Sequence, residues 1–226
     1  MKLNADFSQR AAVHAASLLW TASPMAGVDR RMLDRIGDEV ARATSIVRYA
    51  PGSSFSSHVH TGGEEFFVLD GIFQDEHGAF PAGCYIRNPP QSRHTPGSAP
   101  GCTIFVKLWQ FDLDDRTQVR IDTSKMPYVQ LRDRANVEMM PLFRDAHEDV
   151  RLERWAPGAA ISLPAPGGAE FLLLAGTFEE AGEQFVPQSW LRLPAGATLN
   201  AVAGAEGCVV WAKSGHLSQP SASPPS

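Results

Sequence analysis

Two histidines one residue apart, His58 and His60, stand in a segment whose residue types are typical of metal binding. Successive side chains of an extended strand point to opposite faces, so both imidazoles lie on one face and can reach one ion. The Gly-Gly pair that follows lets the chain bend and bring Glu64 back towards the same point. The segment from Pro51 to Gly71 therefore predicts a site for a metal ion.

A fourth ligand is expected at His94, which follows a turn and a strand edge marked by Gly83 and Pro89. Of the adjacent acids Glu64 and Glu65, only one can reach the ion, because neighbours on a strand face opposite sides. The spacing from the histidines favours Glu64. The predicted ligands are therefore His58, His60, Glu64 and His94, which suit one divalent ion: zinc or Fe(II) first, with Mn, Ni or Cu as alternatives.

The composition describes a turn-rich globular chain of 226 residues, with 43% hydrophobic residues, 19 Gly and 17 Pro. The net charge of -5 and the lack of a Lys/Arg cluster argue against a nucleic-acid partner. No apolar run approaches the roughly 20 residues of a membrane span, and the N-terminal M-K-L-N-A-D-F-S-Q-R lacks the apolar segment of a signal peptide. We therefore expect no membrane association and a cytoplasmic location. Three widely spaced cysteines predict reduced, buried thiols.

Short apolar segments bounded by Gly or Pro follow one another along the chain, which predicts an all-β protein built as a sandwich or barrel. Residues 28–42 are ambiguous, because the apolar residues suit one helical face while Gly37-Asp38 suits a hairpin turn; we favour strands. The charged residues 112–122 are interpreted as a surface link.

The second half of the sequence repeats the first. R-Y-A-P-G at 48–52 returns as R-W-A-P-G at 154–158, an offset of 106 residues, and G-G-E-E-F at 62–66 returns as G-G-A-E-F at 167–171, an offset of 105. Later blocks keep the same order. The chain is therefore predicted to contain two copies of one β-unit.

None of the four predicted ligands returns in the second copy. The sequence alignment places Pro164, Pro166, Ala169 and Leu199 at the positions of His58, His60, Glu64 and His94, whereas Glu65 is matched by Glu170. We therefore expect a metal-binding domain over 28–122 and a domain without metal ligands over 123–216. Residues 1–27 are predicted to be an arm that packs on these domains, and residues 217–226 a disordered tail.

The motif G-x5-H-x-H-x3-E-x6-G from Gly52 to Gly71, followed by G-x5-P from Gly83 and by His94, resembles the two motifs of the cupin superfamily. Gln91 stands where that family usually has glycine. Within the cupins, G-G-E-E-F-F-V-L-D-G and N-P-P-Q-S-R-H-T-P resemble the metal-binding cupin domain of ChrR-type anti-sigma factors. The resemblance implies two tandem jelly-roll barrels, with the metal in the first and the second degenerate.

Two functions follow from this resemblance. One is a sensory or regulatory module that binds a small molecule in the first barrel. The alternative is an Fe(II)-dependent dioxygenase acting on diketones or hydroxyaryl ketones, as in related cupins. The chain lacks the C-x-x-C motif that ChrR proteins use to bind a sigma factor, so the resemblance does not extend to that partner. A homodimer is expected by analogy with other cupins.

Overall fold

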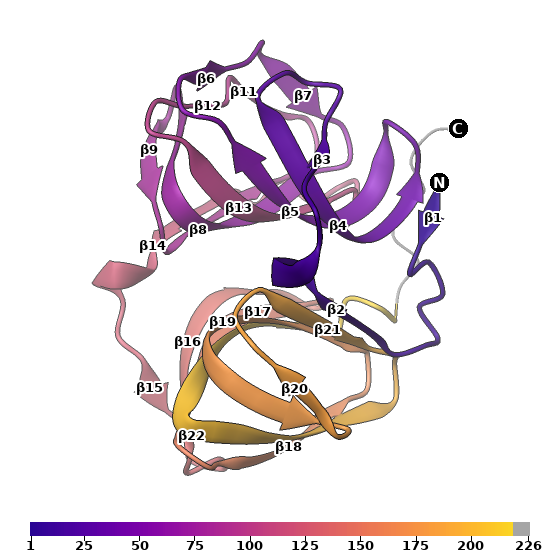
Figure 1. Cartoon of the computed structure of the whole chain (residues 1–226), viewed down its shortest axis with the longest axis vertical. Helices are drawn as coiled ribbons and strands as arrows, with labels where there is room; N and C mark the ends of the chain where they lie inside the picture. The colour runs from indigo at the N-terminus through magenta and orange to yellow at the C-terminus, as the bar shows by residue number, and fades with distance from the viewer. Residues whose placement is uncertain (219–226) are drawn as a thin grey trace. The chain divides into compact units, whose positions relative to one another are not determined.

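The computed structural model describes residues 1–218, which form antiparallel strands and two three-residue 3-10 helices, Ala15–Ser17 and Thr123–Lys125 (Figure 1). The all-β prediction is confirmed. Within these residues, no helix has the length and hydropathy needed to cross a membrane. Most of the tail predicted for residues 217–226 lies outside the described part of the chain.

The chain divides into two compact units. Among the described residues, Met1–Ala5 and Leu18–Lys125 form the first unit, and Asp6–Ser17 together with the residues from Met126 onward form the second. The predicted arm, residues 1–27, is therefore shared between the units: its ends belong to the first unit and its middle belongs to the second.

The first unit contains one large sheet and a separate two-stranded ribbon. The order of the sheet is β1-β4-β5-β13-β8-β10-β14, and the ribbon pairs β11 with β7. Strands β6, β7, β11 and β12 gather at one end of this unit (Figure 1). The strands are β1 Lys2–Leu3, β3 Thr21–Ala22, β4 Val28–Gly37, β5 Ala41–Tyr49, β6 Ser53–Ser54, β7 His58–His60, β8 Glu64–Asp75, β9 Gly78–Pro81, β10 Cys84–Asn88, β11 Ser92–His94, β12 Gly97–Ser98, β13 Cys102–Leu108 and β14 Val119–Asp122.

The second unit repeats this arrangement in the order β15-β16-β17-β22-β19-β21-β2. A single 18-residue strand, β22, takes the place of β11, β12 and β13. The strands are β2 Ala11–His14, β15 Val129–Gln130, β16 Val137–Arg144, β17 Asp149–Trp155, β18 Ala160–Ala165, β19 Ala169–Glu180, β20 Glu183–Phe185, β21 Ser189–Leu193 and β22 Ala197–Ser214.

The matching strand orders confirm the sequence repeat and refine two predictions. Residues 28–42 form β4 and the start of β5, so the strand interpretation is right. The predicted surface link at 112–122 ends in β14, which pairs with β10 and forms one edge of the first sheet. In the second sheet, β2 from the N-terminal segment takes the equivalent place beside β21.

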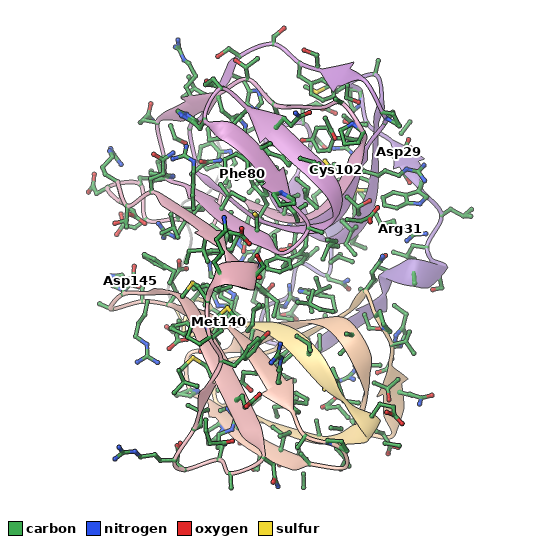
Figure 2. All side chains as sticks on the ribbon, turned by 90° about the vertical axis from the view of Figure 1, so that its left-hand side faces the viewer. Asp29, Arg31, Phe80, Cys102, Met140 and Asp145 are labelled. Carbon is green, nitrogen blue, oxygen red and sulfur yellow. The ribbon has the colours of Figure 1, made fainter. Side chains whose placement is uncertain are left out.

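The interiors of the two units differ in polarity. A continuous apolar core fills the second, including Phe171, Phe178 and Leu199. The apolar core of the first unit is smaller and includes Phe66, Phe73 and Cys102, the last labelled in Figure 2. All three cysteines are free and buried, as predicted.

A buried ion network stabilises the second unit around Glu153, whose side chain is fully buried. Arg134 donates two hydrogen bonds to its carboxylate, at 2.9 and 2.7 Å, while Arg151 and Trp155 donate one each. Burial acts to raise the pKa of Glu153, but the Arg134 hydrogen bonds and the charge of Arg151 outweigh it and lower the pKa from 4.5 to about 2.

This network predicts an acid-sensitive contribution to stability. Because the folded-state pKa of Glu153 is lowered, its stabilisation is complete above about pH 4.5 and is lost as the pH falls towards 2, a change of about 3 kcal/mol. We expect Glu153→Gln to destabilise the protein at pH 7 by roughly that amount and the difference from the parent to shrink below pH 4.5, measured by urea unfolding.

The control is Glu138→Gln, which removes a half-exposed carboxylate 3.8 Å from Arg154 and is expected to cost less than about 1 kcal/mol. A destabilisation by Glu153→Gln that stays constant from pH 7 to about pH 3 would contradict this assignment.

Candidate metal centre

The three predicted histidine ligands lie on the β7–β11 ribbon. The antiparallel register places His94 directly opposite His58 and places Ser92 opposite His60. His58 and His60 share a face because they are two residues apart on β7. The ribbon therefore presents all three imidazoles on one face, although His94 is 34 residues from His60 in sequence.

The nitrogens of these imidazoles converge. One ring nitrogen from each of His58, His60 and His94 lies within 4.8 Å of the other two, and Nε2 of His60 is 2.9 Å from Nε2 of His94. Ligands bound about 2.1 Å from an ion are separated by about 3 Å when they meet at right angles and by about 3.4 Å in a tetrahedral site. The spacing of the histidine nitrogens thus fits one transition-metal ion.

Glu64 adds a carboxylate at the edge of this cluster. Its Oε2 lies 3.3 Å from Nε2 of His60 and 3.6 Å from Nε2 of His94. Glu64 begins β8, immediately after the Gly-Gly bend, and the side chain of Asn88 on β10 donates a hydrogen bond to the same Oε2 at 3.2 Å. The structure therefore gathers the three histidines and places Glu64 beside His60 and His94. Nitrogen with oxygen donors suits Zn, Fe(II), Mn, Ni or Cu.

In His58 and His94, the Nδ1 atom has a partner that orients the imidazole. Nδ1 of His58 lies 3.2 Å from the carbonyl oxygen of Ser56, and Nδ1 of His94 lies 3.4 Å from Oδ2 of Asp75. A proton on each Nδ1 satisfies these acceptors and leaves the Nε2 lone pair free for an ion, an arrangement common among metal-binding histidines.

Electrostatics favour the unprotonated ring of His60. Burial lowers the pKa of His60, and the nearby His94 and His58 add to this effect, although the carboxylate of Glu64 opposes it. A neutral imidazole is the form that binds a metal.

Glu65 lies on the opposite face of β8 and takes no part in the cluster. Its Oε1 accepts a 2.6 Å hydrogen bond from the hydroxyl of Tyr85. In the second unit, Glu170 accepts the equivalent bond from Nε1 of Trp190. The second copy therefore retains this acid for a buried hydrogen bond, and the Tyr-to-Trp replacement keeps a donor at the same place.

The strand registers correct the sequence alignment of the ligand positions. In the second unit Leu199 pairs with Leu163, as His94 pairs with His58 in the first. The equivalents of His58 and His60 are therefore Leu163 and Ala165, not Pro164 and Pro166. The one-residue gap lies before β7, where the sequence offers no matching block to locate it. All four ligand positions of the second unit contribute to its apolar core, as Leu163, Ala165, Ala169 and Leu199.

Gln91 forms the turn before β11 in spite of its departure from the cupin motif. Its φ of 70° lies in the left-handed region, as does the φ of 83° at its counterpart Gly196. The backbone N–H of Gln91 donates to the carbonyl oxygen of His60 at 2.9 Å, which ties β11 to β7. The turn therefore keeps its geometry without glycine.

A cavity of about 660 Å³ adjoins the cluster, and its walls include His58, His60 and Glu64. Aliphatic residues of β5 and β13 form much of the rest, with the aromatic rings of Tyr49 and Trp109. Trp109 contributes to the cavity wall, whereas Phe66 and Phe105 are buried core residues.

Sequence reasoning did not single out Tyr49, Asn88 or Asp75, which are spread over three strands. Arg87 is also outside the cavity wall: its side chain is 2% exposed and forms an ion pair with Asp115 at 2.5 Å. The side chain of His216 is 5% exposed, and its Nε2 lies 2.9 Å from Oε1 of Glu170. Hydrogen-bond partners depend on strand register, which no local motif encodes.

Two antiparallel barrels with the same strand order, the first carrying a cluster of three histidines and a carboxylate, define a bicupin. The ChrR cupin-like domain matches the chain twice, over residues 8–112 and 116–218. The chain belongs to this family. Among curated proteins, none matches it.

Similar solved structures include a candidate dioxygenase from Nostoc punctiforme, with 16% identity and a TM-score of 0.76 over 96% of this chain and 88% of that one. The pirin YhhW from Escherichia coli, in complex with nickel(II), has 14% identity and a TM-score of 0.63 over 92% and 99%. A cupin 2 barrel protein from Leptotrichia buccalis has 12% identity and a TM-score of 0.60 over 90% and 95%. These similarities concern the fold alone.

Removing a ligand tests the metal centre directly. We expect His58→Ala and His94→Ala each to abolish stoichiometric metal, because each removes a nitrogen from the cluster. Elemental analysis of protein purified without chelator or added metal measures this. Glu65→Gln, beside Glu64 but on the opposite face of β8, is the matched control and should leave the metal content unchanged. Full metal content in both histidine variants would refute the ligand assignment.

Asp75 is predicted to support the centre by orienting His94. Asp75→Asn should weaken zinc affinity by roughly 10- to 100-fold, in the range measured for partners of metal-binding histidines, in a competition titration with a chromophoric chelator. Glu76→Gln removes the next carboxylate along the chain, which accepts a hydrogen bond from the Thr95 N–H instead. Equal losses of affinity in the two variants would indicate a general charge effect and contradict an orienting role.

Proposed function

We propose that the first barrel holds one divalent transition-metal ion on His58, His60, Glu64 and His94 and binds a small oxygen-bearing organic molecule beside it, as a sensory or regulatory module. The observation that carries this proposal is the cavity of about 660 Å³, because three of the four proposed ligands line its wall. A volume of this size is in the range of small-molecule sites.

A purely structural metal is a weaker interpretation, because structural zinc sites are closed by four protein ligands with no room for another. Here the donors face an open space. The walls of that space are mainly aliphatic, with Val47, Ile104 and Val106 among them, so they suit the apolar body of an organic molecule. A molecule with an apolar body and an oxygen donor at one end would suit both the aliphatic walls and the metal ion.

An Fe(II)-dependent dioxygenase is the second candidate, and Tyr49 favours it. The ring of Tyr49 lines the cavity, and burial raises the pKa of its phenol, with the charge of Glu64 adding to the effect. The hydroxyl therefore stays protonated and is able to donate a hydrogen bond to an oxygen of a bound substrate. A bound Fe(II) ion would supply the Lewis acidity and redox chemistry of the reaction.

The proposed metal is zinc or Fe(II) first. Manganese, nickel and copper remain candidates because mixed nitrogen and oxygen donors bind all of them. The complex of the similar pirin with nickel(II) supports keeping nickel among them.

The proposal predicts that a ligand changes the surroundings of the metal. We expect 2-hydroxyacetophenone, which offers two adjacent oxygen donors, to shift the visible absorption of the Co(II)-loaded protein. Val47→Trp should keep one equivalent of cobalt but lose the shift, because Val47 lines the cavity without being a proposed ligand and the larger indole takes up cavity space. An unchanged parent spectrum at saturating probe, or an equal response of Val47→Trp, would contradict binding in the cavity.

Oxygen uptake by the Fe(II)-loaded protein with the same probe separates the two candidates. Consumption well above that of His94→Ala would favour the dioxygenase. A spectral response without oxygen consumption would favour the sensory module.

A further inference from the structure

Arg30 places a positive charge on the inner face of the first barrel. On β4 it pairs with Val47 of β5, which in turn pairs with Ile104 of β13. All three residues, together with Val28 two positions earlier on β4, line the cavity beside the metal cluster. A guanidinium therefore lies in a row of aliphatic side chains within the same cavity as the proposed ligands.

The guanidinium of Arg30 lacks a protein partner among the described residues. Its Nε is buried without a hydrogen-bond acceptor, and no ion pair joins Arg30 to Glu39, the other charged residue besides Glu64 in the cavity wall. An unpaired cation beside apolar walls costs free energy, because it loses part of its hydration without gaining a counter-charge. A ligand that brings an anion removes that cost.

A second arginine, Arg35, interacts with the charge of Arg30. Burial lowers the pKa of Arg35, and the charge of Arg30 lowers it further. The carboxylates of Asp38 and Glu39 act in the opposite direction and raise the pKa of Arg35. Glu39 is exposed to solvent. A second cation near Arg30 raises the local attraction for an anion.

We propose that the cavity selects a small organic acid, with its carboxylate on Arg30, its apolar body between the aliphatic residues of β5 and β13, and an oxygen donor directed at the metal centre. This inference rests on the proposed function and names its ligand class. A guanidinium matches the planar geometry of a carboxylate with paired N–H donors. One unpaired arginine with Glu39 nearby suits a singly charged group better than a phosphate ester.

The test compares 3-phenylpropanoate with 3-phenylpropanamide, which has the same body without the charge. Isothermal titration calorimetry of the zinc-loaded protein should show the acid binding roughly tenfold or more tightly than the amide. Arg30→Gln should weaken the acid by roughly 10- to 100-fold and leave the amide within about twofold. Arg30→Lys should restore part of the preference, because it keeps the charge without the planar fork.

Arg31→Gln is the matched control. Arg31, labelled in Figure 2, is the next residue on β4, so its side chain leaves the opposite face of the strand from Arg30. Its guanidinium lies over the Trp20 ring at 4.2 Å. This variant removes the same charge from the same strand, and it should bind both probes as the parent does. Equal binding of acid and amide by the parent, or equal losses of acid binding in the two arginine variants, would overturn the proposal.

A carboxylate also binds metals directly, so the same pair of probes is measured with metal-free His94→Ala. If His94→Ala still binds the acid more tightly than the amide, and if adding Arg30→Gln removes that difference, the role of Arg30 is supported even if the metal proposal fails. A preference that disappears with the metal would overturn the role of Arg30 and leave the proposed function standing. Tighter binding of 2-phenylethyl phosphate than of the acid would overturn the carboxylate assignment.

Discussion

The proposed metal centre depends on one backbone register, the pairing of His94 with His58 between β11 and β7. Because side chains alternate along a strand, a shift of one residue would turn His94 to the other face and remove it from the cluster. The turn at Gln91 helps to hold this register through the hydrogen bond from its N–H to the His60 carbonyl. The barrel strands that frame the ribbon then set how close Glu64 comes to the imidazoles.

The two copies show how one barrel interior serves two purposes. In the second unit, leucine and alanine occupy all four ligand positions and complete an apolar core, so that unit is stabilised by burial. In the first unit the same positions carry polar donors beside a cavity, and stability must come from elsewhere in the barrel. Both copies keep the hydrogen bond to Glu65 or Glu170, which belongs to the shared architecture.

Local patterns predicted much of this structure. The H-x-H spacing, the Gly-Gly bend and the adjacent acids predicted His58, His60 and Glu64 as candidate ligands, and the structure places their side chains near one another. The repeat predicted two β-units. Features set by distant strand pairing were missed. The position of the gap before β7 needed the register of Leu163 with Leu199. The pairing of β2 with β21, which adds an edge strand to the second sheet, joins residues far apart in sequence. Arg30 lies outside every sequence motif, so only its position in the cavity wall points to a role in ligand binding.

X-ray absorption spectroscopy at the absorption edge of the metal bound to the purified protein tests the central claim most directly, because it reports the ligand atoms around that ion. The account predicts a shell of nitrogen and oxygen scatterers near 2.1 Å with the multiple-scattering pattern of about three imidazoles, lost in His58→Ala. A shell dominated by sulfur near 2.3 Å, or one with no imidazole scattering, would contradict the assignment of His58, His60, Glu64 and His94.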